Sequence, residues 1–461
     1  MTERTQTNSI SSWCAMLVAS WCFNFCYFAL LAVISPLIWY RVLVLKKYRE
    51  GWGAKLFGCV PEFPTKPHGS KTKRVWLHAV SVGEVNLLRP LLRQIAEKQP
   101  DWECVISTTS STGYAVAQKQ YGENHAIFFA PLDFSWAVHK AVKRIKPDML
   151  VLAEQEIWPN LVAQCKLCGV KIAVVNGRIS EGGFRRYRFI RPLWRKVMRQ
   201  LDLLCVQSET YSDWFQKLGA NPKAVHVTGS LKFDNARTDR ENPVTQSLRQ
   251  LAKIAPDETV FLVGSTQEPE EELAVDAWLA LRESHPKLRL ILVPRHPERF
   301  DCVAQMLDRK IGNSPQHWQH RSRLQIDTVI DENSVEHGRQ PILVDTVGEL
   351  GAWWGTAHIA YVGGSMGTRG GQNMLEPAAY GAAVSFGPKT KNFRDIVSLM
   401  LADEAATIVC DGNELTAFVR RCLDDADFAA TQGQRARQLV QKHLGATAKT
   451  IDLLAGLMPV V

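Results

Sequence analysis

Short hydrophobic segments alternate with helix-like stretches along most of this chain, and this alternation restricts the possible folds more than any other feature. Parallel strands joined through helices form sheets covered on both faces, so the pattern predicts a doubly wound α/β architecture. In the first half, strands are expected at Val75–Val80, Cys104–Thr109, Ala126–Pro131, Met149–Ala153, Lys171–Asn176, Leu203–Gln207 and Val225–Gly229. In the second half, they are expected at Val260–Ser265, Arg289–Pro294, Ile342–Thr346, Ile359–Gly363, Ala383–Phe386 and Thr407–Cys410.

A polar, charged stretch, Asp234–Asn242, separates the two halves. A length of 461 residues allows more than one domain. We therefore expect two doubly wound, Rossmann-like domains, with ligands at the carboxyl ends of the strands and in a cleft between the domains. The expected divisions are residues 1–59, 60–240 and 241–461, the last of which includes the terminal helices.

The N-terminal region contains a long uncharged segment, Ser11–Tyr40. About 20 apolar residues cross a bilayer, so the segment predicts one membrane-spanning helix. Only Arg4 is basic before it, whereas four basic residues follow within 41–49, which predicts a cytoplasmic location for the rest of the chain. This charge order is opposite to that of a cleaved signal peptide. Asn24 and Pro36 leave an interfacial or re-entrant helix as the alternative.

The chain carries a formal net charge of +9, with a second basic cluster between Arg185 and Arg199. Such clusters suit anionic lipid or nucleic acid, and no helix-turn-helix or aromatic ladder supports nucleic acid. The 11 cysteines have irregular spacing and do not indicate a disulfide scaffold. Cys165-x-x-Cys168 lacks a second ligand pair, so a structural role is favoured over metal binding.

A glycine-rich loop, Gly363–Gly371, follows a predicted strand and leads to a helix expected near Gln372 or Asn373. Glycines allow the backbone to approach an anion, and a helix N-terminus favours negative charge, so the loop predicts a phosphate site. Glu376, one turn later, suits ribose hydroxyls. Neither G-x-G-x-x-G nor G-K-[ST] is present, which favours a nucleotide sugar over NAD or ATP. The alternative is a turn without a ligand.

Charged residues end several strands of the first half. Glu84 begins a helical pattern, and it would act as a base only if burial or a neighbouring carboxylate raised its pKa. Glu154 and Glu156 follow another strand, and Lys232 lies near the end of this half, where it could offset charge on a phosphate leaving group. The alternatives are helix capping for Glu84 and Glu156, and a surface ion pair with Asp234 for Lys232.

In the second half, Arg295 ends a strand and can bind phosphate through two parallel hydrogen bonds. Gly348–Leu350 begin a helix whose N–H groups could bind a base or a phosphate. Either could instead be a simple turn. Asp424–Asp427 superficially offer an Asp-x-Asp metal clamp, but they lie between helical stretches, so a solvated turn is favoured.

Six motifs in a fixed order resemble those of the 3-deoxy-D-manno-octulosonic acid (Kdo) transferases of Gram-negative lipopolysaccharide synthesis. They are His78–Glu84, Glu154-x-Glu156-x-Trp158-Pro159-Asn160, Gly229–Asp234, Val293–Arg299, Gly348–Leu350 and Val362–Glu376. The resemblance runs from the membrane segment to nearly the end of the chain. It implies a two-domain GT-B glycosyltransferase that moves Kdo from CMP-Kdo to lipid IV-A by direct, inverting displacement, with no cofactor and no metal in the active site.

By motif position, the resemblance implies that Glu84 is the general base and that Glu154 and Lys232 stabilise the transition state. It implies a CMP site made of Pro294, Arg295, Gly348, Glu349, Leu350, Asn373, Met374, Leu375 and Glu376. The basic stretch 185–199 would meet the acceptor phosphates and an anionic inner membrane. Gln155 stands where family members commonly have threonine, which leaves the acceptor geometry open. The number of Kdo residues transferred and the oligomeric state are not set by the sequence.

Two other classes of function compete with this interpretation. A nucleotide-sugar epimerase shares the expected fold, but the N-terminal membrane segment argues against it. A membrane-tethered binder of anionic lipid or nucleic acid would explain the basic clusters, but it would leave Glu84, Glu154 and the glycine-rich loop without a role.

Overall fold

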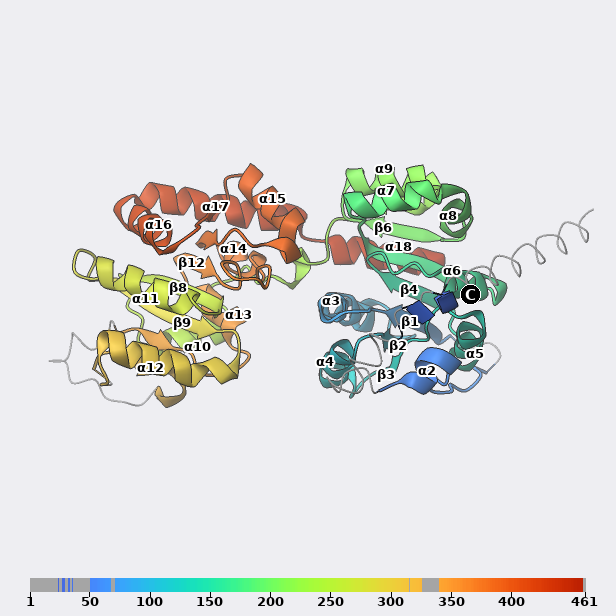
Figure 1. The fold of residues 1–461 in the computed structure, drawn as a ribbon, viewed down its shortest axis with the longest axis horizontal. Coiled ribbons are helices and arrows are strands. Elements are labelled where there is room, and N and C mark those ends of the chain that lie inside the picture. The colour runs from blue at the N-terminus through green and yellow to red at the C-terminus, as the bar shows by residue number, and fades with distance from the viewer. Residues whose placement is uncertain are drawn as a thin grey trace, which may run out of the picture. The chain divides into compact units, whose positions relative to one another are not determined.

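The computed structural model of the protein describes residues 50–67, 71–314, 316–325 and 340–458, together with scattered positions between 24 and 35. These residues form two compact units (Figure 1). Unit 1 comprises the chain up to Asn235 together with residues 444–461, and unit 2 comprises Ala236–His443. Each unit is built on its own parallel sheet covered by helices, which confirms the predicted doubly wound α/β architecture.

Unit 1 contains a seven-stranded sheet in the order β3-β2-β1-β4-β5-β6-β7. Its strands are β1 (Lys73–His78), β2 (Trp102–Thr108), β3 (Ala126–Phe129), β4 (Met149–Ala153), β5 (Lys171–Gly177), β6 (Leu203–Val206) and β7 (Val225–Val227). Its helices are α2 (Trp52–Phe57), α3 (Val82–Lys98), α4 (Ser111–Tyr121), α5 (Ser135–Ile145), α6 (Pro159–Leu167), α7 (Glu181–Phe189), α8 (Arg191–Met198), α9 (Glu209–Leu218) and α18 (Ala446–Leu457), with 3-10 turns η1 (Pro222–Ala224) and η2 (Phe233–Asn235).

Alternate residues of these strands enter two different cores, as the two-residue period of a strand requires. Trp76 packs with residues of α5, α6, α8 and α9 on one face of the sheet. Val75 and Leu77 pack with residues of α3, α4 and α18 on the other face. Serine side chains accept a backbone N–H at the start of α3, α4, α7 and α9, which explains where these helices begin.

The last helix, α18, belongs to unit 1, although it follows unit 2 in the sequence (Figure 1). Ile451 and Leu454 are fully buried in the core beside α3. Asp234 accepts N–H groups from Gly445 and Thr447, which fixes the start of α18 next to the end of unit 1's first segment. The expected second domain, residues 241–461, is therefore wrong for this helix, because its apolar face completes the core of unit 1.

Unit 2 contains a second parallel seven-stranded sheet, in the order β10-β11-β9-β8-β12-β13-β14. Its strands are β8 (Thr259–Thr266), β9 (Leu288–Pro294), β10 (Gln319–His320), β11 (Ile342–Leu343), β12 (Ile359–Val362), β13 (Ala383–Phe386) and β14 (Ala406–Ile408). Its helices are α10 (Pro243–Leu251), α11 (Glu270–Leu281), α12 (Phe300–Ile311), α13 (Leu350–Trp353), α14 (Leu375–Ala379), α15 (Arg394–Ala402), α16 (Gly412–Asp424) and α17 (Ala426–His443). The 3-10 turns are η3 (Pro297–Arg299), η4 (Arg321–Arg323), η6 (Trp354–Thr356) and η7 (Lys391–Phe393).

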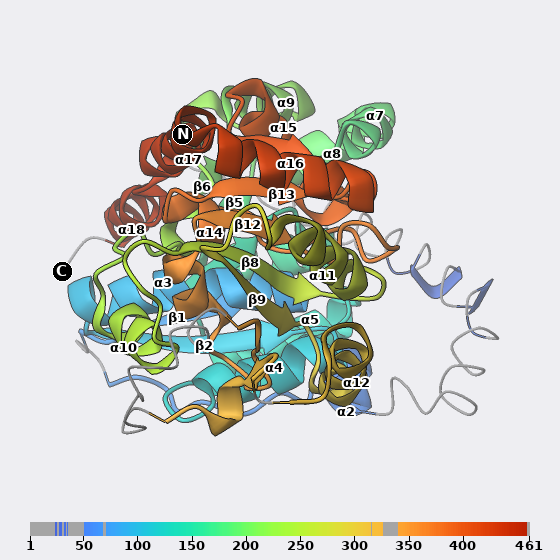
Figure 2. The ribbon, with the colours of Figure 1, turned by 90° about the vertical axis from the view of Figure 1, so that its left-hand side faces the viewer.

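Helices cover both faces of this sheet (Figure 2). Phe261 and Val263 of β8 pack with residues of α11, α12 and α16 on one face. On the other face, a side chain added at Gly264 would meet Trp354 and Leu350, so β8 is closely packed there against the segment that contains α13 and η6.

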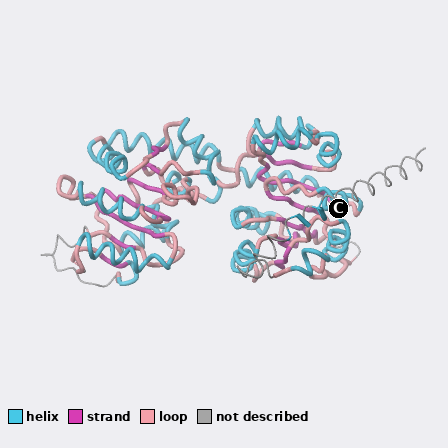
Figure 3. Tube along the Cα trace, viewed as in Figure 1, coloured by secondary structure: helices cyan, strands magenta, loops and turns pink. Residues whose placement is uncertain are grey.

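Both sheets reverse their strand order beside their first strand, between β1 and β4 in unit 1 and between β8 and β12 in unit 2. Unit 1 thus has the Rossmann order, whereas in unit 2 β11 lies between β10 and β9. Ligands of such open parallel sheets bind outside the carboxyl ends of the strands at the reversal. The loops that follow the strands can be traced in Figure 3. They are the segments that carry the predicted site residues.

The segment predicted to span the membrane, residues 11–40, lies outside the described residues except for the scattered positions named above. Among the residues that the structure describes, no helix has the length and apolar character needed to cross a bilayer.

Candidate active site

Glu84 caps its own helix in unit 1. Its carboxylate accepts the Val80 N–H at 2.8 Å and the Ser81 hydroxyl at 2.8 Å, while Ser81 Oγ accepts the Glu84 N–H at 3.4 Å. This reciprocal arrangement resembles a capping box and fixes the carboxylate at the turn between β1 and α3. The capping alternative is thus correct as a description of contacts. Capping still leaves the carboxylate able to bind other groups, since each oxygen can accept a further hydrogen bond.

Glu154 follows β4 directly and has a left-handed backbone conformation, with φ +56°. Its Oε2 accepts the Nε–H of Arg178 at 2.8 Å, and Arg178 Nη2 lies 2.8 Å from the same oxygen in an ion pair. Asn176 Nδ2 donates to the other oxygen at 3.4 Å. A left-handed conformation is costly for residues other than glycine and persists where surrounding contacts enforce it, as is common at functional sites.

Three carboxylates gather at the carboxyl ends of β1 and β4. Burial raises the pKa of Glu84, and the negative charge of Glu154 adds to the rise, whereas Val80, Ser81 and Arg178 oppose it. Burial also raises the pKa of Glu156 to about 7, with contributions from the charges of Glu84 and Glu154. The condition that would let Glu84 act as a base is therefore met. Its carboxyl has a raised proton affinity in a group of acids that influence one another.

The loop that carries Lys232 is attached to the same group of residues. Asn176 Oδ1 accepts the Leu231 N–H at 3.0 Å, and the same Asn176 side chain donates to Glu154. Asn176 is buried and also has a positive φ, at +55°. The structure thereby brings the backbone next to Lys232 close to Glu154.

The basic helix α7 borders the acidic cluster. Burial and the charge of Glu156 raise the pKa of Tyr187, which places this α7 side chain in the electrostatic field of Glu156. Tyr187 stacks on Trp194 of α8 with ring centroids 4.4 Å apart, which joins the two helices. Phe189 of α7 is 90% exposed, and Ile190 and Leu193 are also exposed large apolar residues.

In unit 2, Arg295 and Glu376 belong to one charged group. Burial raises the pKa of Glu376, and this rise is opposed by the Asn373 amide, the Arg295 charge and a hydrogen bond from Trp354. Asn373 Nδ2 donates to Glu376 Oε1 at 3.0 Å, and Asn373 Oδ1 accepts the Leu375 N–H at 3.2 Å. Asn373 therefore both orients Glu376 and supports the start of α14. Arg295 itself is exposed, at the end of β9.

Glu349 lies just before α13 and is held by four donor groups. Arg321 forms a two-bond pair with it, at 2.9 Å from Nε and 2.7 Å from Nη2. Thr346 Oγ1 donates at 2.8 Å and Trp353 Nε1 donates at 3.2 Å, all within unit 2. Two neighbouring tryptophans thus donate hydrogen bonds to the two acidic residues of the predicted CMP site. Trp353 contacts Glu349, and Trp354 contacts Glu376.

The other predicted CMP-binding residues present backbone rather than polar side chains. Pro294 ends β9 and is buried, and Met374 and Leu375 are fully buried. Gly348 has φ +94°, a conformation that glycine adopts without strain, and a side chain added there would meet nothing within 4 Å. Leu350 begins α13 and packs toward β8.

The first part of the glycine-rich loop does not have the role that the sequence indicated. The N–H groups of Gly364, Ser365 and Met366 donate to the carboxylate of Glu270, at 2.7, 2.9 and 3.0 Å. Glu270 begins α11 and is only 1% exposed. The prediction that these groups hold a phosphate is therefore wrong, because a side chain of the protein occupies the position that an anion would take.

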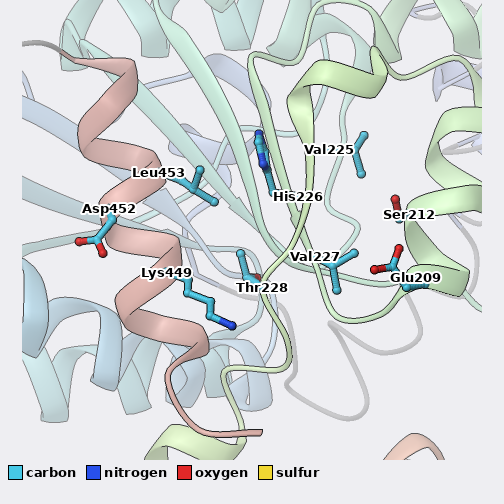
Figure 4. A pocket seen from close by; sticks show the side chains of 9 residues that line it. All are labelled: Glu209, Ser212, Val225, His226, Val227, Thr228, Lys449, Asp452 and Leu453. Atoms are coloured by element: carbon cyan, nitrogen blue, oxygen red, sulfur yellow. The ribbon is translucent and has the colours of Figure 1, made fainter.

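An open pocket in unit 1 lies away from the predicted site residues (Figure 4). It is bounded by residues of α9, by β7 with the adjacent Thr228, and by Lys449, Asp452 and Leu453 of α18. The Asp424–Asp427 segment forms the turn between α16 and α17, where Asp425 Oδ1 accepts the Phe428 N–H at 2.9 Å. This is the turn that the sequence favoured.

Sequence reasoning missed three contacts of the site. Asn176 and Arg178 lie at the carboxyl end of β5, as Glu154 lies at the carboxyl end of β4. Polar residues that end parallel strands meet at one edge of the sheet. That signal could have found them. Arg321 is different, because it lies in the short 3-10 turn η4, which has no hydrophobic strand pattern before it.

The fold is shared with a glycosyltransferase and with a nucleotide-sugar epimerase of known structure. A glycosyltransferase from Rickettsia africae has a TM-score of 0.51 at 11% identity, covering 85% of this chain and 100% of its own. A UDP-GlcNAc 2-epimerase from Neisseria meningitidis has a TM-score of 0.53 at 9% identity, covering 83% and 100%. At these identities the likeness defines the class as a GT-B-like α/β fold and does not decide between transferase and epimerase.

Sequence comparison decides the family. Residues 51–235 match the family described as 3-deoxy-D-manno-octulosonic-acid transferase (kdotransferase). The 3-deoxy-D-manno-octulosonic acid transferase of Haemophilus influenzae is 30% identical over 430 residues, covering 93% of this chain and 94% of the relative. The chain belongs to the Kdo transferase family of glycosyltransferases.

Proposed function

We propose that the protein transfers Kdo from CMP-Kdo to lipid IV-A in lipopolysaccharide core synthesis, by an inverting displacement that needs no metal ion. The single observation that carries the proposal is the buried carboxylate cluster at the ends of β1 and β4, in a chain of the Kdo transferase family. The choice of CMP-Kdo and lipid IV-A, the inversion and the absence of a metal requirement rest on the family resemblance.

Glu84 is the proposed general base. It takes the proton of an acceptor sugar hydroxyl, whose oxygen then attacks the anomeric carbon of Kdo. The bond between that carbon and the phosphate oxygen breaks, and CMP leaves with the electron pair. The raised pKa of Glu84 supports this role, because a general base works best when its pKa lies near the pH at which the enzyme operates. Glu154, held by Arg178, and Lys232 are proposed to stabilise the charges of the transition state.

Unit 2 is the proposed donor-binding unit. Arg295 is exposed at the end of β9 and can pair with the phosphate of CMP-Kdo, while Glu376 suits the ribose hydroxyls. Gly348, Glu349 and Leu350, with Asn373, Met374 and Leu375, would complete the CMP site. Pro294 contributes backbone only. The reaction requires that the donor held by unit 2 reach the acceptor hydroxyl beside Glu84.

The acceptor is proposed to approach along α7 and α8. These helices combine exposed apolar residues with arginines and a lysine between 185 and 199, the composition that anionic lipid surfaces attract. Their Tyr187 lies in the field of Glu156, so a phosphorylated lipid bound there would be near the acidic cluster. We propose an inner-membrane location with both units on the cytoplasmic side, on the charge pattern of residues 1–49.

The test uses the full-length protein with CMP-Kdo and lipid IV-A. We expect CMP release together with a product whose mass increases by whole Kdo residues. The Glu84→Gln variant should lose about 10²- to 10⁴-fold in kcat, the contribution of a general base, while binding CMP nearly as well as the unmodified protein.

Lys98→Ala is the matched control, since Lys98 lies on the same helix as Glu84 and forms an exposed ion pair with Asp452. It should retain full turnover. A folded Glu84→Gln protein with unchanged kcat would refute the assigned base, and an unmodified protein that releases no CMP would refute the activity itself.

A further inference from the structure

We propose that Glu270 is a positioning residue for the donor-binding segment Asn373–Glu376. Its carboxylate is a built-in anion that shapes the glycine-rich loop, so this part of the loop organises the donor site without binding the donor phosphate. The inference rests on the proposed function for the identity of the donor. The internal anion itself is argued from contacts within unit 2 alone.

The carboxylate of Glu270 has a full set of donors. Oε1 accepts the Ser365 and Met366 N–H groups and the Tyr361 hydroxyl, the last at 3.1 Å. Oε2 accepts the Gly364 N–H and the Gln267 N–H, at 2.7 and 2.9 Å. Successive backbone N–H groups that converge on one point form the kind of nest that binds anions. Here the anion is covalently part of the chain.

The fit around the carboxylate is close. A side chain added at Gly363 would come within 2.8 Å of Glu270 Oε2 and within 2.6 Å of the Thr266 backbone. Glycine is required there because the end of β12 lies directly against the turn between β8 and α11. Gly363 thus permits the close approach of Glu270 and Thr266.

The loop transmits its shape toward the donor segment through backbone contacts. The carbonyl of Gly364, the first loop residue that Glu270 holds, accepts the Gly371 N–H at 2.8 Å. Gly371 is separated from Asn373 by one residue. Ser365 adds a second attachment, since its hydroxyl accepts the Gly387 N–H at 2.8 Å and its carbonyl accepts the Lys389 N–H at 2.8 Å. Removing the carboxylate would loosen the loop at Gly364 and Ser365, and with it the contact that holds Gly371 just before Asn373.

An amide cannot replace this carboxylate. In Glu270→Gln, one oxygen can still accept one group of donors, but the NH₂ group would face the other donors, which leaves buried N–H groups without an acceptor. In Glu270→Ala, the N–H groups of Gly364, Ser365 and Met366 lose their acceptor, so a small carboxylate such as formate can bind them and restore the shape of the loop. Chemical rescue by formate is therefore the diagnostic readout.

Glu271 supplies the matched control. It is the adjacent residue, equally buried, and it pairs with Arg299 through two hydrogen bonds at 3.0 and 3.1 Å rather than with the loop. Glu271→Gln removes a buried charge from the same helix turn. It leaves the glycine-rich loop and its anion in place.

The experiment measures CMP affinity by calorimetry and the unfolding temperature of the full-length protein, each across a formate titration. We expect Glu270→Ala to bind CMP about 10- to 100-fold more weakly, the effect of a small displacement of binding groups, and to recover with formate. Glu270→Gln should be weakened without recovery, and Glu271→Gln should not respond to formate.

A folded Glu270→Ala protein with unchanged CMP affinity would overturn the proposal. If Glu270→Ala fails to fold, formate should restore folding, and a failure of formate to do so would also overturn it. An unmodified protein that does not bind CMP would contradict the proposed function instead. In that case a formate-dependent rise in the unfolding temperature of Glu270→Ala would still support the internal anion.

Discussion

Individual carboxylates of this protein occupy environments that are unfavourable for folding stability. Glu84, Glu154 and Glu156 are close enough to influence one another, and only Glu154 has an arginine bonded to it among the described contacts. Gathering like charges at a strand end is unfavourable for folding, and such arrangements are typical of catalytic sites. The cost should be measurable residue by residue.

The stability cost of Glu156 should depend on pH. Its pKa is about 7 in the folded protein, against an ordinary value of 4.5. Between these values the unfolded chain releases the proton while the folded protein retains it, so stability falls as pH rises and changes no further above about pH 7. Glu156→Gln removes this effect. We expect its stability gain over the unmodified protein to grow by about 1–3 kcal/mol from pH 4.5 to 7.5.

Chemical denaturation at several pH values measures this gain. Glu123→Gln, at an exposed position of unit 1, provides the reference for a surface substitution. A stability difference for Glu156→Gln that stays constant over the whole range would contradict the assigned environment of Glu156.

At the scale of elements, α7 and α8 combine charge and apolar surface in an unusual way. The aromatic pair Tyr187 and Trp194 anchors them to each other, while Phe189 and Ile190 project from their junction. Exposed apolar residues beside basic ones are typical of surfaces that bind lipid. We therefore expect the proposed lipid acceptor to contact unit 1 at this junction.

Phe189→Ser should raise the KM for lipid IV-A presented in mixed micelles by about tenfold or more, because burying a phenylalanine side chain contributes about 1.5–3 kcal/mol. Turnover at saturation and CMP affinity should stay unchanged. Steady-state kinetics with varied acceptor measures the effect. Val227→Ser, an exposed apolar position on β7, should behave like the unmodified protein. Equal KM values for both variants would exclude α7 and α8 as the acceptor surface.

Most elements could be predicted because strand periodicity is a local property of the sequence. Met149–Ala153 and Ala383–Phe386 were predicted with the observed limits, and the other predicted strands differ by a few residues at their ends. Strand β10, of two residues, was missed because so short a segment carries no periodic pattern. The observed proximity of Glu84 and Glu154 agrees with the rule that parallel strands end at one edge, although it was not among the predictions from the sequence.

Contacts between distant segments could not be predicted in the same way. The donors around Glu349 come partly from Arg321 in η4, and the donors around Glu270 come from a glycine-rich loop almost a hundred positions later. A nest of N–H groups has the same sequence signature whether it receives a ligand or a side chain. Only tertiary structure distinguishes the two occupants.

At the scale of the whole molecule, the assignment of α18 to unit 1 can be tested by unfolding. Ile451→Ala should destabilise unit 1 by about 2–5 kcal/mol, the usual cost of a large cavity in a core. Leu307→Ala, in the core of unit 2, should have a similar cost there. If CMP binds unit 2, as proposed, added CMP should raise only the transition that Leu307→Ala lowers.

Calorimetry of both variants with and without CMP separates the two transitions. If Ile451→Ala instead lowered the unfolding transition that CMP raises, α18 would belong to unit 2. The measurement therefore distinguishes the observed arrangement from the simpler one expected from chain order.

The position of α18 also has a consequence for synthesis of the protein. Synthesis of unit 1 begins before that of unit 2, yet part of the core of unit 1 comes from α18, which is translated after every residue of unit 2. Every residue of unit 2 is translated in the interval, so the core of unit 1 stays incomplete until unit 2 has been made. A premature stop just after residue 443 would spare the later-made unit and leave the earlier-made one unfinished.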